Sequence, residues 1–180
     1  MNSKSLRPSF RGLRQAGMSL LETVVALAIL LIATVGIMSL AGISMSTTED
    51  QGHLAARTTE YAQDKMEQLI SLAWGDTTSD TTVFPAANSG GTGLAIGGSS
   101  NPGAPATGYV DYLDLSGNPL TISNGVAPAN WFYIRVWQIS SPSANLKQIT
   151  ITSKVRSEVG SKGVGSLPQS TLVQLKTFPF

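Results

Sequence analysis

The chain contains no cysteine, and His53 is the only histidine among its 180 residues. The absence of cysteine excludes disulfide cross-links, a cysteine nucleophile, a thiolate metal site and a lipoprotein anchor. A lone histidine argues against a Ser-His-Asp triad or a histidine-rich metal site. Any folded part of the chain must therefore be held together by packing, hydrogen bonds and ion pairs.

Charged residues are scarce and unevenly distributed, with 12 Lys and Arg against 11 Asp and Glu. Four of the basic residues lie in the first 17 positions, where there is no acid: Lys4, Arg7, Arg11 and Arg14. The rest of the chain has 8 basic and 11 acidic residues, a net charge of −3 (8 − 11). The basic balance belongs to the first 17 residues, and we predict no nucleic-acid partner.

Recognisable catalytic and ligand-binding motifs are lacking as well. No glycine-rich phosphate or dinucleotide motif occurs in the required order. The pairs Asp76/Asp80 and Asp111/Asp114 each supply too few oxygens for calcium, and we expect them to be solvated or to cap turns. We predict a protein that is not an enzyme and has no cofactor, metal or small-molecule substrate.

Charge is absent altogether from the 26 residues 23–48, which are mostly apolar. A helix of that length spans roughly 39 Å, more than the roughly 30 Å hydrocarbon core of a bilayer. The basic residues before it should keep the N-terminus in the cytoplasm and send the rest of the chain across. We therefore predict a single membrane-spanning helix, N-terminus inside.

A secretory signal peptide is an alternative, because it also combines a basic start with an apolar run. Cleavage after Ser39-Leu40-Ala41 would release a soluble protein that begins at Gly42. The apolar core of a signal peptide is usually about 7 to 15 residues, and this run is longer. The length therefore favours a permanent membrane helix.

Glu22 stands immediately before the apolar run, where a carboxylate contributes nothing to spanning lipid. One explanation is a capping box, because Ser19-Leu20-Leu21-Glu22 fits the S-x-x-E pattern. A second explanation applies if apolar helices pack together, because a carboxylate among them is costly unless it meets an ammonium on a neighbouring helix. At about 4 Å and an effective dielectric near 20 such a pair is attractive by about 4 kcal/mol, enough to fix the register between apolar helices.

The string GMSLLETVVAL at residues 17–27 resembles the cleavage and assembly signal of type IV pilin-like proteins. The resemblance implies cleavage by a prepilin peptidase between Gly17 and Met18 and N-methylation of Met18. It also makes Glu22 the fifth residue of the mature chain and an assembly residue. Its implied partners are the peptidase, the inner membrane and other pilin or pseudopilin subunits, with the head in the periplasm before assembly into a pilus or pseudopilus.

The helix is expected to continue beyond the membrane over residues 18–74, with Gly75 ending it. No proline occurs between Glu22 and Trp74, and 57 residues give roughly 85 Å. An apolar stripe continues along its second half: Leu54, Ala55, Tyr61, Ala62, Met66, Leu69, Ile70 and Ala73. We expect charged residues on the other faces, among them Arg57, Glu60, Asp64, Lys65 and Glu67.

This second half also carries a resemblance. Residues 61–69, YAQDKMEQL, resemble the stem of minor pilins of the type IV pilus modification group and of the related minor pseudopilins. One departure is Ser39, which stands where major pilins commonly have a proline. Gly36 and Gly42 could supply a softer joint, so melting of the stem on assembly is left open.

Residues 75–108 are rich in Gly, Ser, Thr, Asn and Pro, and we expect a long surface loop that buries little. Residues 109–180 carry strand signals at 109–115, 120–122, 131–139, 146–157 and 170–178. A helix followed by hairpin-linked strands predicts an α+β fold with an antiparallel sheet, as in pilins. On the strand at 146–157 we expect Ile149, Ile151 and Val155 to point inward.

The strand at 131–139 places aliphatic side chains on one face: Phe132, Ile134 and Val136. We expect that face to meet the helix. The opposite face would then carry Trp131, Tyr133, Arg135 and Trp137, either as an interface for a partner or as cross-strand packing.

These features together predict a structural minor subunit of a type IV pilus. A minor pseudopilin of type II secretion is the alternative within the family. An inner-membrane anchored binding module and a secreted domain released by signal peptidase are the alternatives outside it.

Overall fold

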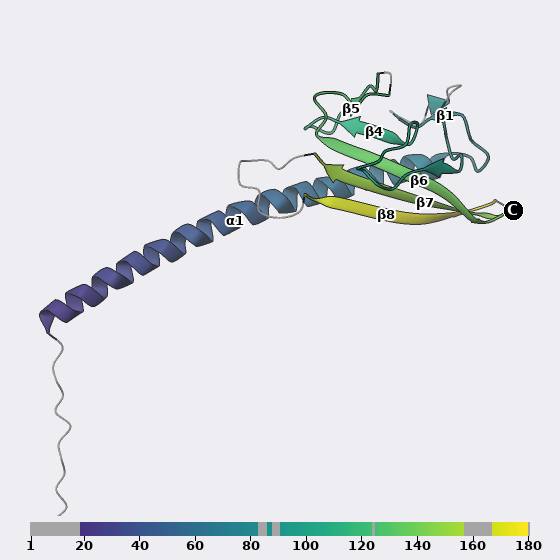
Figure 1. Ribbon diagram of the computed structural model, residues 1–180. Helices are drawn as coiled ribbons and strands as arrows, with labels where there is room; N and C mark the ends of the chain where they lie inside the picture. The colour runs from purple at the N-terminus through teal and green to yellow at the C-terminus, as the bar shows by residue number, and fades with distance from the viewer. Residues whose placement is uncertain (1–18, 83–85, 88–90, 124, 157–166, 180) are drawn as a thin grey trace, which may run out of the picture. The chain divides into compact units, whose positions relative to one another are not determined.

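The computed structural model describes residues 19–82, 86–87, 91–123, 125–156 and 167–179 (Figure 1). The leader 1–17 and Met18 lie outside the described residues. The chain divides into two compact units, residues 1–44 and 45–180, which are treated separately below. One long helix and a small antiparallel sheet are present, and the predicted α+β fold class is confirmed.

The helix, α1, runs from Leu20 to Ser71, and the regular elements that follow it in the described part of the chain are strands. The strands are β1 (Ser79–Asp80), β2 (Ala86–Ala87), β3 (Gly97–Gly98), β4 (Val110–Leu113), β5 (Pro119–Leu120), β6 (Tyr133–Ser143), β7 (Leu146–Val155) and β8 (Gln169–Thr177). The main sheet has the order β5-β4-β6-β7-β8, with β3 paired to β6, and β1 and β2 form a separate pair. All pairings are antiparallel, as predicted.

The C-terminal end of α1 lies earlier than predicted. The helix ends at Ser71, and Gly75 has no positive φ, so the expectation that Gly75 terminates it is wrong. Lysines from the sheet take the final carbonyl groups instead. Lys176 Nζ donates to the carbonyls of Ile70 and Leu72, and Lys147 Nζ donates to that of Trp74 at 2.7 Å. Cationic side chains at a helix C-terminus satisfy carbonyls that have no partner within the helix.

Strands β6 and β7 form the central hairpin of the sheet. The turn lies at residues 144–145, and β6 extends beyond the predicted strand 131–139 and continues through Pro142. The pairing shifts between Ser140 and Ser143, which lets the strand accommodate a proline that cannot donate a ladder hydrogen bond. The predicted inward direction of Ile149, Ile151 and Val155 on β7 is confirmed, since all three are buried.

Residues 45–71 of α1, called the stem below, pack on one face of this sheet. Leu54, Tyr61, Ala62, Met66 and Leu69 are buried on the predicted stripe. They join two core clusters with residues from β4, β6 and β7, including Leu113, Tyr133, Trp137, Ile139, Ile149, Ile151 and Val155. The amphipathic half of α1 is therefore the layer that covers the sheet.

Strand β6 faces the helix with the side that was expected to point away. Tyr133, Arg135 and Trp137 lie against α1, while Ile134 and Val136 join Val110 and Tyr112 in a third cluster on the other side. Both sides of β6 are covered, because partly buried apolar residues such as Leu120 and Ile122 pack on that third cluster. Alternation in the sequence could not identify the helix-facing side, because both sides are largely apolar.

The Gly- and Ser-rich segment 75–108 buries more than its composition predicts. Leu94 is fully buried in the cluster under the helix, and Ser79 and Thr81 are also buried. Asp76 organises the start of the segment, since its Oδ1 accepts from the amides of Thr78 and Ser79. The hydrogen bonds from Ser79 lower the pKa of the Asp76 carboxyl. Residues 83–85 and 88–90 of the predicted loop lie outside the described residues.

A buried ionic cluster joins the stem to the sheet and consists of Lys65, Asp111, Arg135 and Asp64. Asp111 and Arg135 are directly opposite on β4 and β6, and Arg135 Nε and Nη2 bind the two Asp111 oxygens at 2.8 and 3.0 Å. Lys65 Nζ lies 2.7 Å from Asp111 Oδ2 and also donates to the Thr81 carbonyl. Arg135 Nη1 reaches α1 at Asp64 (2.7 Å) and at the Tyr61 carbonyl (3.2 Å).

The electrostatics of the cluster follow from its burial. Lys65 and Asp111 have fully buried side chains, while Asp64 is 55% exposed. Burial lowers the pKa of Lys65, and the charge of Asp111 opposes that shift. Burial also lowers the pKa of Arg135, but the charge of Asp111 and hydrogen bonds to Asp111 and Asp64 outweigh it, and the pKa is raised. Asp111 is thus the carboxylate on which two buried cations depend.

Replacement of Asp111 by alanine should lower the free energy of unfolding by about 3–5 kcal/mol, because Lys65 and Arg135 would keep buried charges without their carboxylate. Urea unfolding of the full chain in detergent micelles, followed by tryptophan fluorescence, measures the loss. Asp114→Ala is the matched control, since Asp114 directly follows β4 and accepts hydrogen bonds within the next turn, from the amides of Ser116 and Asn118 and from the Asn118 side chain. Equal losses in the two variants would contradict the role given to the cluster.

Candidate assembly site

The N-terminal half of α1 presents an exposed apolar surface. Every described side chain from residue 19 to 46 is exposed. The large apolar ones include Val24, Leu27, Leu31, Ile32, Ile37, Met38 and Leu40, each more than half exposed. By length and composition, α1 contains a segment able to cross a membrane. A surface of this kind in water is costly, so it requires lipid or other apolar helices around it.

The start of the helix is capped by Ser19. The amide of Glu22 donates to the Ser19 carbonyl at 2.9 Å and to Ser19 Oγ at 3.2 Å. This geometry satisfies an amide that has no partner within the helix. Only half of the predicted capping box forms, because the Glu22 carboxylate makes no hydrogen bond or ion pair with any described residue. The cap therefore does not account for the acid.

Polar groups within the apolar run are satisfied inside the helix. The hydroxyls of Thr23, Thr34 and Ser39 donate to the carbonyls of Leu20, Leu31 and Val35 at 2.8, 2.9 and 2.9 Å. Such back-bonding leaves these three hydroxyls without need of water, as lipid or close helix packing demands. Glu22 is the one charged residue at positions 19–46, and a carboxylate away from water needs a counter-charge.

The helix remains unbroken across Ser39, the position where a proline is commonly found in major pilins. Gly36 and Gly42 both lie within it, and a Cβ at either place would meet no described atom within 4 Å. These glycines therefore open two notches in the apolar surface, at which another helix can approach closely. Each also weakens the helix by roughly 0.5–1 kcal/mol relative to alanine.

The proposed interface strand does not form one exposed patch. Tyr133, Arg135 and Trp137 are 2%, 1% and 0% exposed, because they pack against the stem. Trp131 lies apart from them, half-buried on Tyr112 at a ring separation of 5.5 Å and under the Arg156 guanidinium. The prediction of a shared interface is wrong for the three buried residues. Packing, the alternative left open by the sequence, is what these side chains do.

Sequence reasoning missed the pairing of Lys65 and Asp111 with Arg135. Lys65 was expected on a polar face of the helix but is fully buried, with its ammonium 4.3 Å from the centre of the Trp137 ring. One signal was available, because Lys65 follows Tyr61 and Ala62 by four and three positions and so shares their face. The helical spacing was a better guide to its position than its charge.

The predicted acidic pairs have different roles. Asp76 and Asp114 cap turns, as expected, while Asp111 is the centre of the buried ionic cluster. Asp80 accepts hydrogen bonds from the amide and hydroxyl of Thr82. Among the described residues, no group of three or more His, Cys, Asp or Glu side chains is placed to hold a metal ion.

Trp137→Ala should lower the free energy of unfolding by about 3–5 kcal/mol, because it would leave a cavity between the stem and the sheet. Trp131→Ala should cost clearly less, since Trp131 is only half-buried. Thermal unfolding of the full-length variants in micelles compares the two. A small loss for Trp137→Ala would mean that this side chain belongs to a surface.

Comparison of the chain with protein-family models, with curated proteins and with solved structures yields no match. The features that bear on function are the exposed apolar half of α1, the Glu22 carboxylate, which has no partner among the described residues, and the sequence around Gly17.

Proposed function

We propose that this protein is a structural minor subunit of a type IV pilus or of a closely related filament. A prepilin peptidase would cut between Gly17 and Met18 and methylate the new N-terminus. The subunit would wait in the inner membrane with its head in the periplasm and then enter the filament through its N-terminal helix. The observation that carries the proposal is the exposed apolar segment 19–46, whose single carboxylate, Glu22, has no partner among the described residues.

The exposed helix supports a protein that exchanges one apolar environment for another. Lipid tails and apolar helices both shield such a surface from water, so movement from membrane to filament core costs little hydrophobic free energy. The hydroxyls of Thr23, Thr34 and Ser39 are already bonded to the helix backbone, so neither environment leaves them unsatisfied. One surface can therefore serve first as a membrane anchor and then as a packing face.

Glu22 supports assembly in a defined register. Near the edge of a membrane a carboxylate can reach the headgroup region at modest cost, whereas among packed helices it needs a counter-charge. Cleavage before Met18 would create a free ammonium four residues away in sequence. An ammonium on one subunit and Glu22 on the next would meet only at one axial offset, which turns a nonspecific apolar contact into a specific one.

The head supports a structural role in a different way. Its stem half is attached to the sheet by an ionic cluster and by two lysines at the helix end, without cysteine. Such a head can remain folded while the N-terminal half changes its surroundings.

The rival proposals are a minor pseudopilin of a secretion system, an anchored module that does not polymerise, and a secreted domain.

Replacement of Gly17 by leucine should block processing, because the resemblance to prepilins places a small residue at the cleavage site. Mass spectrometry of the protein made with and without a prepilin peptidase gives the N-terminus. The parent chain and a Gly12→Leu control should begin at a methylated Met18. An N-terminus at Gly42 would instead identify a secreted domain, and an uncut parent chain would identify an anchored module.

Glu22→Gln should be cleaved normally yet be recovered in sheared filaments at least about tenfold less than the parent, because the ion pair that sets the register is lost. Quantitative immunoblots of filament and membrane fractions provide the measurement. Glu67→Gln removes an exposed acid from the same helix and should incorporate like the parent. Normal incorporation of Glu22→Gln would reject the register role.

A further inference from the structure

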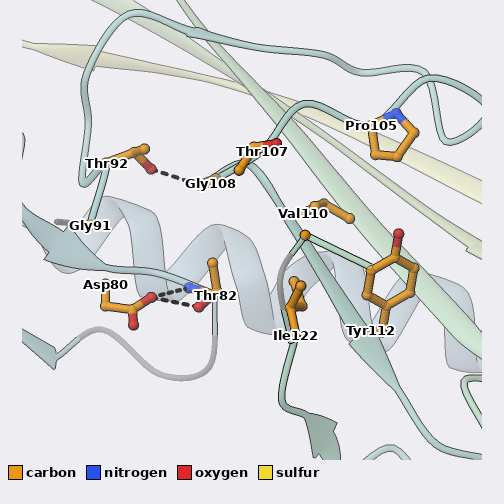
Figure 2. Close-up of a pocket in the computed structure, with 11 residues that line it drawn as sticks. Asp80, Thr82, Gly91, Thr92, Pro105, Thr107, Gly108, Val110, Tyr112 and Ile122 are labelled. Carbon is orange, nitrogen blue, oxygen red and sulfur yellow. Dashed lines mark hydrogen bonds between the residues drawn. The ribbon is translucent and has the colours of Figure 1, made fainter. Parts of the chain in front are cut away.

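A pocket of about 310 Å³ lies on the side of the sheet away from the stem (Figure 2). Its walls come from chain segments that are separated in sequence: Asp80 and Thr82 after β1, Thr92, the stretch from Pro105 to Val110, Tyr112 on β4, and Ile122 after β5. The volume is at the lower end of the range for small-molecule sites, which suits a ligand of about one ring. This pocket has no part in the filament proposal and is argued independently of it.

Tyr112 brings a hydroxyl to the pocket from an otherwise buried side chain. Its side chain is on a strand whose four residues are all buried, and the residue is 6% exposed. Its hydroxyl makes no hydrogen bond with any described residue, and Figure 2 shows it turned towards the Pro105 side of the pocket. A phenolic hydroxyl both donates and accepts, so a ligand in the pocket can hydrogen-bond to it.

Further polar groups lie across the pocket from Tyr112, as Figure 2 shows for Asp80 and Thr82. Asp80 brings a carboxylate to this wall and is fixed there by the amide and hydroxyl of Thr82, at 3.0 and 2.6 Å. Thr107 adds an exposed hydroxyl that has no partner among the described residues. The pocket thus offers one acceptor and two hydroxyls that can donate or accept.

The wall that carries these groups is held rigidly. Thr92 Oγ1 donates to the Gly108 carbonyl at 2.7 Å, which joins the segments around residues 92 and 108. Gly108 has a φ of 81°, and a Cβ there would lie 2.6 Å from Thr92 Cγ2. Only glycine fits this left-handed, crowded position. A pocket that is already shaped loses less entropy when a ligand binds.

The lining limits the chemistry of the ligand. No lysine, arginine or histidine is among the described residues that line the pocket, so a phosphate or carboxylate ligand would find no counter-charge from them. A purely apolar ligand would desolvate Asp80 and the hydroxyls without replacing their hydrogen bonds. Val110 and Ile122 add apolar surface that a fully polar ligand would not use. The remaining ligand has hydroxyl groups at its rim and C–H groups on its face.

We propose that this pocket binds one neutral sugar ring, either as a free monosaccharide or as the terminal residue of a glycan. Asp80 accepts from ring hydroxyls, Tyr112 and Thr107 hydrogen-bond to others, and the C–H face of the ring lies against Val110 and Ile122. The open side of the pocket leaves room for the glycosidic oxygen of a longer chain.

The test is saturation-transfer NMR on the full chain in lauryldimethylamine oxide micelles, which contain no sugar. The probes are glucose, galactose, mannose and N-acetylglucosamine, each free and as its methyl glycoside, with ethanolamine as a cationic probe. Tyr112→Phe removes only the unpartnered hydroxyl, and Asp80→Asn keeps an acceptor for Thr82 while removing the charge. Tyr61→Phe is the matched control, because it removes a buried tyrosine hydroxyl from the stem, near Gly117.

At least one sugar should bind, about five- to tenfold more weakly to Tyr112→Phe and more than about tenfold more weakly to Asp80→Asn, with Tyr61→Phe unchanged. Both patterns of binding support the proposal. Binding of the free sugar alone indicates a monosaccharide ligand, and binding of the methyl glycoside as well indicates the terminal residue of a glycan. The proposal is overturned if no sugar binds, if ethanolamine binds and the sugars do not, or if Tyr112→Phe binds as tightly as the parent. If Tyr112→Phe does not fold, Asp80→Asn decides the matter by the same criterion.

Discussion

The packing of the second unit, residues 45–180, depends on one carboxylate, Asp111, which lies between two buried cations. Arg135 reaches it from the adjacent strand and Lys65 reaches it from the helix, so a single side chain connects β4, β6 and α1. A buried charge is tolerable only when its partners are close and its remaining hydrogen-bonding positions are filled. Arg135 meets that condition through Asp64 and the Tyr61 carbonyl, and Lys65 through the Thr81 carbonyl.

The geometry of this cluster also gives the apolar packing its orientation. The hydrophobic effect is non-directional, so apolar packing alone would let the stem shift along the sheet at small cost in free energy. Charges that must meet at 2.7–3.0 Å allow only one position of the helix on the strands. The lysines of β7 and β8 add a second fixed point at the helix C-terminus, where they bind the last carbonyls. The stem is thereby held at two places along its length.

The two halves of α1 differ in whether their acidic side chains are paired. Asp64 lies on the docked half and is paired with Arg135, whereas Glu22 begins the exposed half and has no partner among the described residues. A carboxylate away from water needs a cation. Within the second unit Arg135 supplies that cation for Asp64, whereas no described residue supplies one for Glu22. A helix with a paired acid in its docked half and an acid at its start without a described partner suits the proposed role, in which the subunit folds alone and assembles with neighbours.

The sequence by itself determined the long helix, its uncharged segment, its docked stripe and the antiparallel sheet, because these depend on local periodicity and on the absence of charge and proline. The motif at Gly17, Met18 and Glu22 was likewise visible, although its function remains a proposal. Only the tertiary structure decided which side of β6 meets the helix, since both sides are apolar enough to be buried. It also decided that Lys65 is inside and that Leu94 of a Gly-rich segment reaches the core. Those outcomes depend on partners distant in sequence: Lys65 becomes tolerable in the core only where the fold brings Asp111 to it.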